Sequence, residues 1–328
     1  MHKIDRRKFL KTLLAASGAT LPAACVTRPA RKMTLGPSGL PVRTLGRTGE
    51  AVTIAGLGGA WIAKGTAEEG RMIVDAAFDA GIRYFDTAPN YGGSEDVLGA
   101  ALKGRRDQVF LTTKLDHVPY AEAQADLEHS LKRLKTDHVD LLLLHGVGLP
   151  NDFGDADACL APDGVLQCAR DAKKKGLTRF IGMSVHRPNA APMKVLDNAG
   201  DDIDVVMPFI NSMVRKEQDP DGDIVRRCAG EGIGLVAMKV LGGSGQLATD
   251  YDAAFRFALS QPGVACAIIG VRTPREARRA AEAARDFRPL SARELKDMLE
   301  LGAHWIQTNA REYTMLYRHF HADRCVTV

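Results

Sequence analysis

The stretch from Tyr84 to Tyr91, which reads Y-F-D-T-A-P-N-Y, joins the end of an apolar run to two ionisable side chains. Tyr84 and Phe85 indicate a buried strand, and Asp86 places a carboxylate where that strand stops. Tyr91 follows after a loop that contains a proline. A phenol has an ordinary pKa of about 10, so it acts as an acid near neutral pH only if a cation lies close to it.

Two later apolar runs also end in ionisable residues, the first in Lys114 and the second in His145. In a parallel barrel the carboxyl ends of all strands open onto one face, so polar groups at strand ends converge there. We therefore expect Asp86, Tyr91, Lys114 and His145 to share one pocket. Lys114, held by Asp86, can lower the pKa of the Tyr91 phenol, and His145 can orient a substrate carbonyl.

The rest of the chain alternates short β-prone runs with amphipathic segments rich in alanine and charge. Such alternation, eight times over, predicts an α/β fold, a closed (β/α)8 TIM barrel. An open doubly wound sheet is the alternative, but no G-x-G-x-x-G follows the first strand. The eight strands are expected at 54–57, 82–86, 109–114, 139–145, 179–184, 204–210, 234–239 and 265–269.

Two further elements are expected outside the repeating pattern, within a barrel domain over residues 40–328. Two β-prone runs between Val42 and Ile54 predict an N-terminal β-hairpin that covers the bottom of the barrel. An extra C-terminal helix is expected from Ser291 to about Thr308, with Ser291 as its cap and Glu294 completing a capping box. The tail from Tyr313 to Val328 is either a loop over the barrel mouth or a poorly ordered terminus.

Residues 1–30 are expected to be a signal peptide and linker rather than part of the fold. Paired arginines, Arg6 and Arg7, precede a short apolar stretch, as in twin-arginine (Tat) export signals, which predicts the Tat export machinery as a partner. The stretch is shorter than the roughly 20 residues that a spanning helix needs. Cys25 follows two alanines, so a lipid anchor there and a plain cleavage both stay open. The predicted location is the periplasm or the cell envelope.

Charge and cysteine content exclude several classes of function. Residues 1–24 carry five Lys or Arg and one Asp, hence +4, which equals the formal net charge of +4 for the whole chain. The remainder is near neutral, so no nucleic-acid partner is expected. The six cysteines show no C-x-x-C spacing, which argues against a metal site.

The motif F-D-T-A-x-x-Y-G, the strand-end Lys114 and the run L-L-L-L-H ending at His145 resemble the aldo-keto reductases in order and rough spacing. The resemblance runs from about Arg43 to the last helix. It implies an oxidoreductase that reduces an aldehyde or ketone to an alcohol with a nicotinamide cofactor. Tyr91 would be the general acid, Lys114 and Asp86 would tune it, and His145 would position the carbonyl of a small-molecule substrate.

The resemblance also implies residues that grip the nicotinamide. Ser184 matches the serine of a Ser-Asn pair found in this family, but Val185 follows it. Met207 stands where the family commonly has a glutamine, and Asn211 is a candidate substitute. Two polar anchors are therefore missing or moved.

The cofactor's phosphates are expected against the ends of the last two strands. The glycine-containing loop after the seventh strand resembles the pyrophosphate loop of the family. The resemblance is greatest to a subfamily that carries an added iron–sulfur region, but the cysteine cluster of that region is absent here. The cofactor contacts that this resemblance implies are Met238, Lys239, Leu241, Gly242 and Gly243. Gly270, Arg272 and Thr273, with Thr273 capping the next helix, form a candidate adenosine-phosphate site. Arg272 favours NADPH, with NADH as the alternative. A solvated face of that helix is expected to carry Arg275, Arg278 and Arg279.

Two other functions are weighed against the reductase. An exported nucleotide-binding or redox-sensing barrel with little turnover is favoured by Val185 and Met207 and opposed by the four strand-end residues. A hydrolase or lyase would need a metal cluster or a carboxylate pair at the strand ends, and the sequence offers neither. Among the remaining histidines, only His186 lies close enough to the expected mouth for a substrate contact.

Overall fold

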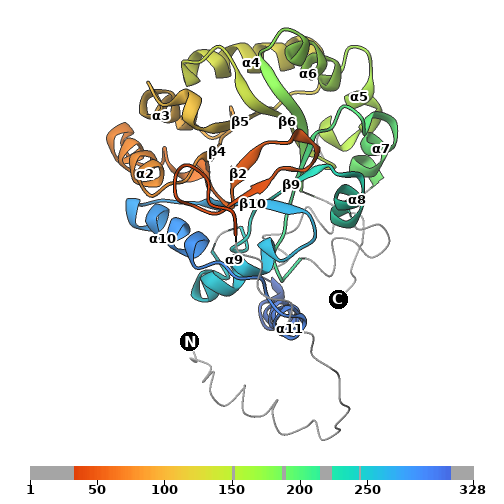
Figure 1. Cartoon of the computed structure of the whole chain (residues 1–328). Coiled ribbons are helices and arrows are strands. Elements are labelled where there is room, and N and C mark those ends of the chain that lie inside the picture. The colour runs from red at the N-terminus through yellow and green to blue at the C-terminus, as the bar shows by residue number, and fades with distance from the viewer. Residues whose placement is uncertain (1–32, 150–151, 187–189, 215–223, 244, 312–328) are drawn as a thin grey trace, which may run out of the picture. The chain divides into compact units, whose positions relative to one another are not determined.

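The computed structural model describes residues 33–149, 152–186, 190–214, 224–243 and 245–311. Within the unit Met33–Val328, eight parallel strands form a closed barrel surrounded by helices, which confirms the predicted (β/α)8 fold (Figure 1). The predicted signal peptide, Cys25 and the tail after Tyr313 lie outside the described residues. In the order of the sheet, the strands are β10 (Val264–Gly270), β3 (Ala55–Gly58), β4 (Tyr84–Asp86), β5 (Phe110–Leu115), β6 (Val139–Val147), β7 (Thr178–Val185), β8 (Val205–Pro208) and β9 (Gly234–Ala237).

Each strand is followed by at least one helix, as right-handed β-α-β connections require. The pairing of Ala267 with Ala55 belongs to the β10–β3 ladder that closes the barrel. The helices between strands are α2 (Ala67–Asp79), α3 (Ser94–Ala101), α4 (Tyr120–Leu134), α5 (Ala156–Leu160), α6 (Val165–Lys174), α7 (Ala190–Ala199), α8 (Ile224–Glu231) and α9 (Tyr251–Leu259), and α10 (Pro274–Arg285) follows the last strand.

Strand β6 shows how one sequence builds two apolar layers. Successive side chains of a strand point to opposite faces of the sheet. Leu141 and Leu143 belong to the cluster inside the barrel, whereas Leu142 and Leu144 belong to the larger cluster between barrel and helices. A strand buried on both faces is therefore a continuous apolar run, and its first less buried residue is His145.

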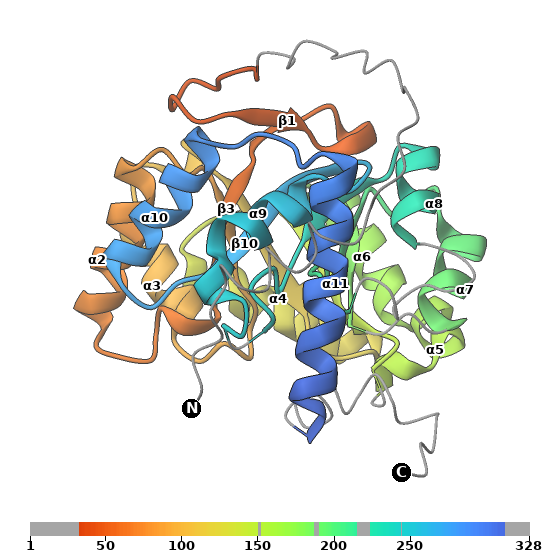
Figure 2. The same ribbon diagram turned by 90° about the horizontal axis from the view of Figure 1, so that it is seen from below.

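The predicted hairpin is present as β1 (Val42–Thr44) and β2 (Ala51–Thr53), which pair antiparallel. Arg43 donates hydrogen bonds of 2.8 and 2.6 Å to the carbonyls of Leu259, the last residue of α9, and Val264, the first residue of β10. Since these carbonyls lie at the amino end of a barrel strand, the hairpin covers the end opposite to the strand termini that carry ionisable residues, and Figure 2 shows β1 crossing that end.

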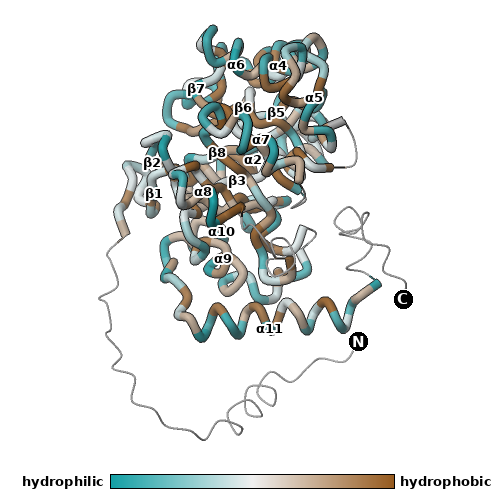
Figure 3. The backbone as a smooth tube through the Cα atoms, turned by 90° about the vertical axis from the view of Figure 1, so that its right-hand side faces the viewer, coloured by the Kyte–Doolittle hydropathy of each residue, from teal (hydrophilic) through white to brown (hydrophobic). Residues whose placement is uncertain are grey.

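The predicted C-terminal helix is α11 (Ala292–Thr308), and its capping box is formed by Ser291 and Glu294 as expected. It packs beside α9, and apolar and polar stretches alternate along it (Figures 2 and 3). Gly302 lies so close to the backbone of Ser212 that a Cβ there would come within 2.1 Å of its carbonyl oxygen. Contact with the loop after β8 therefore requires glycine at this position.

The described residues contain neither a membrane-spanning helix nor a cluster of metal ligands. None of their helices is long and apolar enough to cross a bilayer. No group of three His, Cys, Asp or Glu side chains among them could hold a metal ion.

Candidate functional site

Asp86 and Lys114 meet because of the register between β4 and β5. Asp86 pairs with Thr112. Lys114 lies two residues beyond Thr112, so it is closer to the mouth of the barrel and on the same face of the sheet as Asp86. The Lys114 ammonium donates to the Asp86 carboxylate at 2.8 Å and to the carbonyl of Thr87 at 2.6 Å. Two buried charges are tolerable only when paired and hydrogen-bonded, and this pair meets that condition.

Tyr91 lies against the same lysine. The Lys114 Nζ is 4.8 Å from the centre of the Tyr91 ring. Burial raises the pKa of Tyr91, and the Lys114 charge opposes that effect without cancelling it. Burial also opposes the charge of Lys114, but Asp86 and Tyr91 outweigh it and raise the pKa of the lysine. The phenol is thus protonated near neutral pH, and a fixed cation lies beside it.

His145 completes the group, with its ring centre 6.0 Å from that of Tyr91 in an edge-to-face arrangement. Its Nδ1 forms a short hydrogen bond with the carboxylate of Asp116. Burial is the main cause of a lowered pKa for His145, and the Lys114 charge lowers it further, while Asp116 raises it. The ring is therefore neutral near pH 7. On its other side the ring of His186 lies 6.1 Å away.

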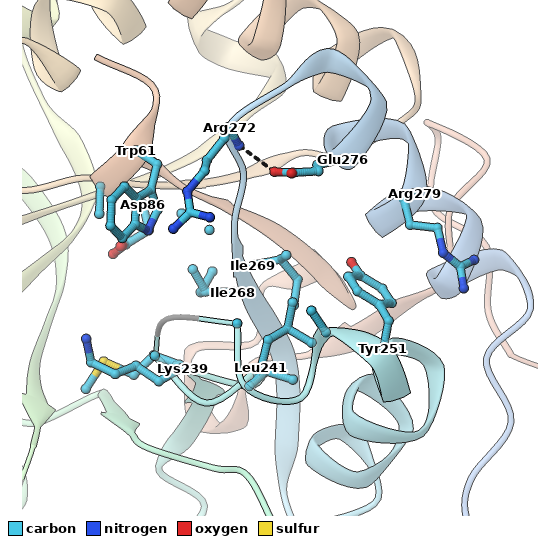
Figure 4. Close-up of a pocket in the computed structure, with 18 of the residues that line it drawn as sticks. Trp61, Asp86, Lys239, Leu241, Tyr251, Ile268, Ile269, Arg272, Glu276 and Arg279 are labelled. Carbon is cyan, nitrogen blue, oxygen red and sulfur yellow. Dashed lines mark hydrogen bonds between the residues drawn. The ribbon is translucent and has the colours of Figure 1, made fainter. Parts of the chain in front are cut away.

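A cavity of about 850 Å³ opens beside Asp86 and Tyr91 and extends along the ends of β9 and β10, whereas Lys114 and His145 do not line it. Asp86 and Tyr91 line its inner end, together with His186 and Met207. Of the residues predicted to bind a cofactor, the cavity wall includes Met238, Lys239, Leu241, Gly243, Gly270, Arg272 and Thr273 (Figure 4). Gly242 is next to this wall in sequence but does not line the cavity, and Ser244 lies outside the described residues.

Asn211 does not line the cavity, so the structure gives no support to its predicted contact with a nicotinamide. Its amide nitrogen donates to the carbonyl of Lys239 at 2.9 Å, and its oxygen accepts from the backbone of Met213 and Val214. Lys239 has a φ of 52°, which is uncommon for a residue other than glycine. Asn211 therefore braces the strained turn that starts the loop after β9.

Ser184 is also turned toward the protein. Its hydroxyl accepts a hydrogen bond of 2.8 Å from the backbone N–H of Gly146, directly after His145, and it is fully buried. Ser184 therefore fixes the carboxyl end of β6. In the wall of the cavity the predicted polar anchors are replaced by the thioether of Met207.

The amino end of α10 forms the other end of the cavity. Thr273 caps the helix by accepting from the backbone N–H of Glu276 at 3.2 Å, and Pro274 occupies its first turn, as predicted. The Arg272 guanidinium lies 4.2 Å from the centre of the Trp61 ring. Figure 4 shows Arg272 beside Trp61, with its backbone hydrogen-bonded to Glu276. A helix amino end next to an arginine favours an anion.

Several residues that line the cavity were not predicted from the sequence as ligand contacts. Trp61 follows the glycines after β3, and Tyr251 begins α9. Arg279 lies over the Tyr251 ring at 5.1 Å and pairs with Asp252. Arg275 and Arg278 are exposed, as expected for a solvated helix face, and together with the half-buried Arg279 they also line the cavity. An arginine-rich stretch next to a predicted phosphate site was the available signal.

The residues present fit a nicotinamide dinucleotide in most respects. Backbone at positive φ over Gly242, Gly243 and Gly245 lets the loop after β9 come close to a ligand. Arginines surround the far end and apolar side chains line the middle. At the end near Tyr91, no side-chain amide stands among the described residues of the wall.

The fold and the site together define a (β/α)8-barrel protein with a buried lysine–aspartate pair, a tyrosine and a histidine at the carboxyl ends of its strands. Residues 54–253 match the model of the Aldo/keto reductase family, so the chain belongs to that family.

Two curated relatives illustrate the match. The chain is 30% identical over 162 residues to the uncharacterized oxidoreductase YqkF of Bacillus subtilis, which covers 45% of this chain and 49% of that protein. It is 32% identical over 162 residues to L-galactose dehydrogenase of Arabidopsis thaliana, with 44% and 48% covered. The matched region thus spans about half the length of these relatives. Among solved structures, an aldo-keto reductase from Klebsiella pneumoniae in complex with NADPH has a TM-score of 0.65 at 24% identity, covering 80% of this chain and 95% of that one, and this likeness concerns the fold.

Proposed function

We propose that the chain reduces an aldehyde or ketone to an alcohol with NADPH, with Tyr91 as the general acid. The observation that carries this proposal is the position of Lys114, which donates to Asp86 at 2.8 Å and lies 4.8 Å from the Tyr91 ring. A buried cation whose charge is neutralised on one side by a carboxylate and meets a phenol on the other suits proton donation by that phenol.

The role of each side chain follows from its surroundings. Bound in the cavity, the nicotinamide would supply a hydride to the carbonyl carbon. Tyr91 gives its proton to the carbonyl oxygen, and Lys114 stabilises the phenolate that results. Asp86 keeps Lys114 in place, and the His145 ring orients the oxygen. Met207 contributes apolar surface to the inner end of the cavity.

NADPH is proposed as the cofactor, with NADH as the alternative, because of the charge at the far end of the cavity. Arg272 and the amino end of α10 offer a cation and backbone N–H groups where an adenosine phosphate would lie.

The proposal is tested by adding a panel of aldehydes and ketones to the protein with NADPH and following nicotinamide absorbance. Oxidation of NADPH that depends on one of the carbonyls supports the function, and oxidation that is equally slow with every carbonyl and without any would refute it.

An exported location is a separate proposal that rests on Arg6 and Arg7 before a short apolar stretch. Replacing both by lysine keeps the charge but should block Tat export, so the chain should accumulate in the cytoplasm of a Tat-competent host. Unchanged export of the Arg6→Lys/Arg7→Lys variant would contradict the Tat assignment. A processed N-terminus that carries lipid on Cys25 would add a membrane anchor.

A second candidate function is a nucleotide-binding or redox-sensing barrel with little turnover. Two features favour it. Met207 lines the inner cavity wall, and the side-chain amide of Asn211 and the hydroxyl of Ser184 form hydrogen bonds within the protein instead of lining the cavity. Tight binding of one nucleotide without carbonyl-dependent oxidation would select this function.

A further inference from the structure

Asp116 is a charged residue at the site to which the proposed function assigns no role. It lies just beyond β5, two residues after Lys114, so strand alternation carries it to the same face as the lysine. One carboxylate oxygen hydrogen-bonds to Nδ1 of His145, and the other accepts from the backbone N–H of Asn90 at 3.0 Å. Asp116 therefore contacts both the histidine and the residue that precedes Tyr91.

The carboxylate is held in place from behind. The backbone N–H of Asp116 donates to Asp126 Oδ2 at 2.8 Å, and Asp126 also binds the ring and backbone of His117. The Asp116 side chain is only 14% exposed, and that of His145 only 11%. Asp116 and His145 are thus fixed in an environment that largely excludes solvent. The direction of the hydrogen bond between them decides which nitrogen of the His145 ring carries the proton.

An ionised carboxylate only accepts hydrogen bonds, so the hydrogen between the two residues belongs to Nδ1. We infer that Asp116 is a positioning residue that holds neutral His145 as its Nδ1–H tautomer and leaves Nε2 as the nitrogen that meets the substrate. This inference rests on the proposed function, since it specifies how His145 acts in that reaction.

The tautomer has a chemical consequence. A neutral Nδ1–H imidazole presents at Nε2 a lone pair that accepts from an O–H group, such as the alcohol product. The ring can donate to a carbonyl oxygen from Nε2 only after it gains a second proton. Protonation of His145 thus converts an acceptor into a donor.

Several groups around His145 affect that protonation. Lys114 of β5 opposes it with its positive charge, whereas Asp116 and Asp86 favour it. The rings of Tyr91 and His186 also lie near it, with centres 6.0 and 6.1 Å from that of His145. Loss of the Asp116 charge should therefore move the titration of His145 to lower pH.

The test uses the full-length chain labelled with ¹⁵N on histidine, with the His145 signal identified by its loss in the His145→Gln variant. Long-range ¹H–¹⁵N correlation spectra then show which ring nitrogen carries the proton. We expect an Nδ1–H tautomer in the wild type and, in Asp116→Asn, a titration midpoint at lower pH. In that variant kcat/KM for carbonyl reduction should fall by about 10-fold or more, while NADPH binding stays unchanged.

The matched control is Asp137→Asn, because Asp137 pairs with His138 Nδ1 at 2.7 Å on the surface. That variant should alter only the His138 signal. An Nε2–H tautomer of wild-type His145, or an unchanged His145 titration in Asp116→Asn, would overturn the inference. The Nδ1–H tautomer in a protein that reduces no carbonyl would refute the proposed function and leave the tautomer assignment standing.

Discussion

The Lys114 ammonium and the Asp86 carboxylate lie 2.8 Å apart, with side chains that are only 1% and 5% exposed. They sit on neighbouring strands, and the β4–β5 register alone makes them meet. Burial raises the pKa of Asp86, and the lysine opposes that effect. Burying this ion pair has a desolvation cost, and it places a fixed cation beside the Tyr91 ring.

Removing the cation should therefore destabilise the fold as well as abolish turnover. Lys114→Met leaves a buried carboxylate without its partner, which typically costs about 3–5 kcal/mol in the free energy of unfolding. Urea denaturation would measure this loss. In the control, Lys194→Met breaks an exposed pair with Asp157, which contributes about 1 kcal/mol or less. Equal stability of the two variants would show that the buried pair contributes no more to the free energy of unfolding than the exposed pair.

Tyr91→Phe should reduce kcat by about 100- to 10,000-fold, because it removes the proton donor and little else. NADPH affinity should be retained, and fluorescence titration of the variant would establish that. Tyr120→Phe is the control, since the Tyr120 hydroxyl binds Asp171 at 2.9 Å on the helices outside the barrel. A Tyr91→Phe variant with wild-type turnover would eliminate the assigned acid.

Arg272→Ala should weaken NADPH binding by about 10- to 100-fold and NADH binding much less, because a charged hydrogen bond to a phosphate contributes about 1.5–3 kcal/mol. Competitive titration with the two nucleotides gives the ratio directly. Arg293→Ala is the control, an exposed arginine on α11 that does not line the cavity. Equal losses for NADPH and NADH would remove the argument for NADPH.

The capping box of α11 predicts a dependence of stability on pH. Its backbone and side-chain hydrogen bonds with Ser291 lower the pKa of Glu294 to about 2. A carboxyl whose pKa is lowered by folding stabilises the protein above its ordinary pKa, and that contribution is lost as pH falls from about 5 toward 2. The side chain is 42% exposed, so screening limits the effect to about 1 kcal/mol.

Glu294→Gln tests this point, because glutamine can complete a capping box without titrating. The difference in unfolding free energy between the wild type and this variant should shrink on acidification. The control is Glu300→Gln, which changes an exposed glutamate of the same helix outside the capping box. If the difference in unfolding free energy between wild type and Glu294→Gln stayed constant with pH, the capping box would not be the source of the pH dependence.

The sequence was sufficient for the barrel and for the four residues at its mouth, because strand ends are marked by a change from apolar to ionisable residues. Asp116 was not predicted, although it follows Lys114 by two residues and strand alternation could have identified it. The role of Asn211 could not have been predicted from the sequence, since an asparagine after a strand has the same pattern whether it binds a ligand or braces a turn. The contact of Tyr251 with Arg279 depends on how α9 and α10 lie together, which no local pattern specifies.

The most direct test of the central claim is a single-turnover experiment on the NADPH complex. NADPH is first titrated into the protein until its fluorescence saturates, and an aldehyde or ketone is then mixed with the complex in the absence of free nucleotide. The account predicts saturable binding followed by one equivalent of nicotinamide oxidation, fast in the wild type and nearly absent in Tyr91→Phe. Failure to bind NADPH or NADH, or binding without oxidation by any carbonyl, would contradict it.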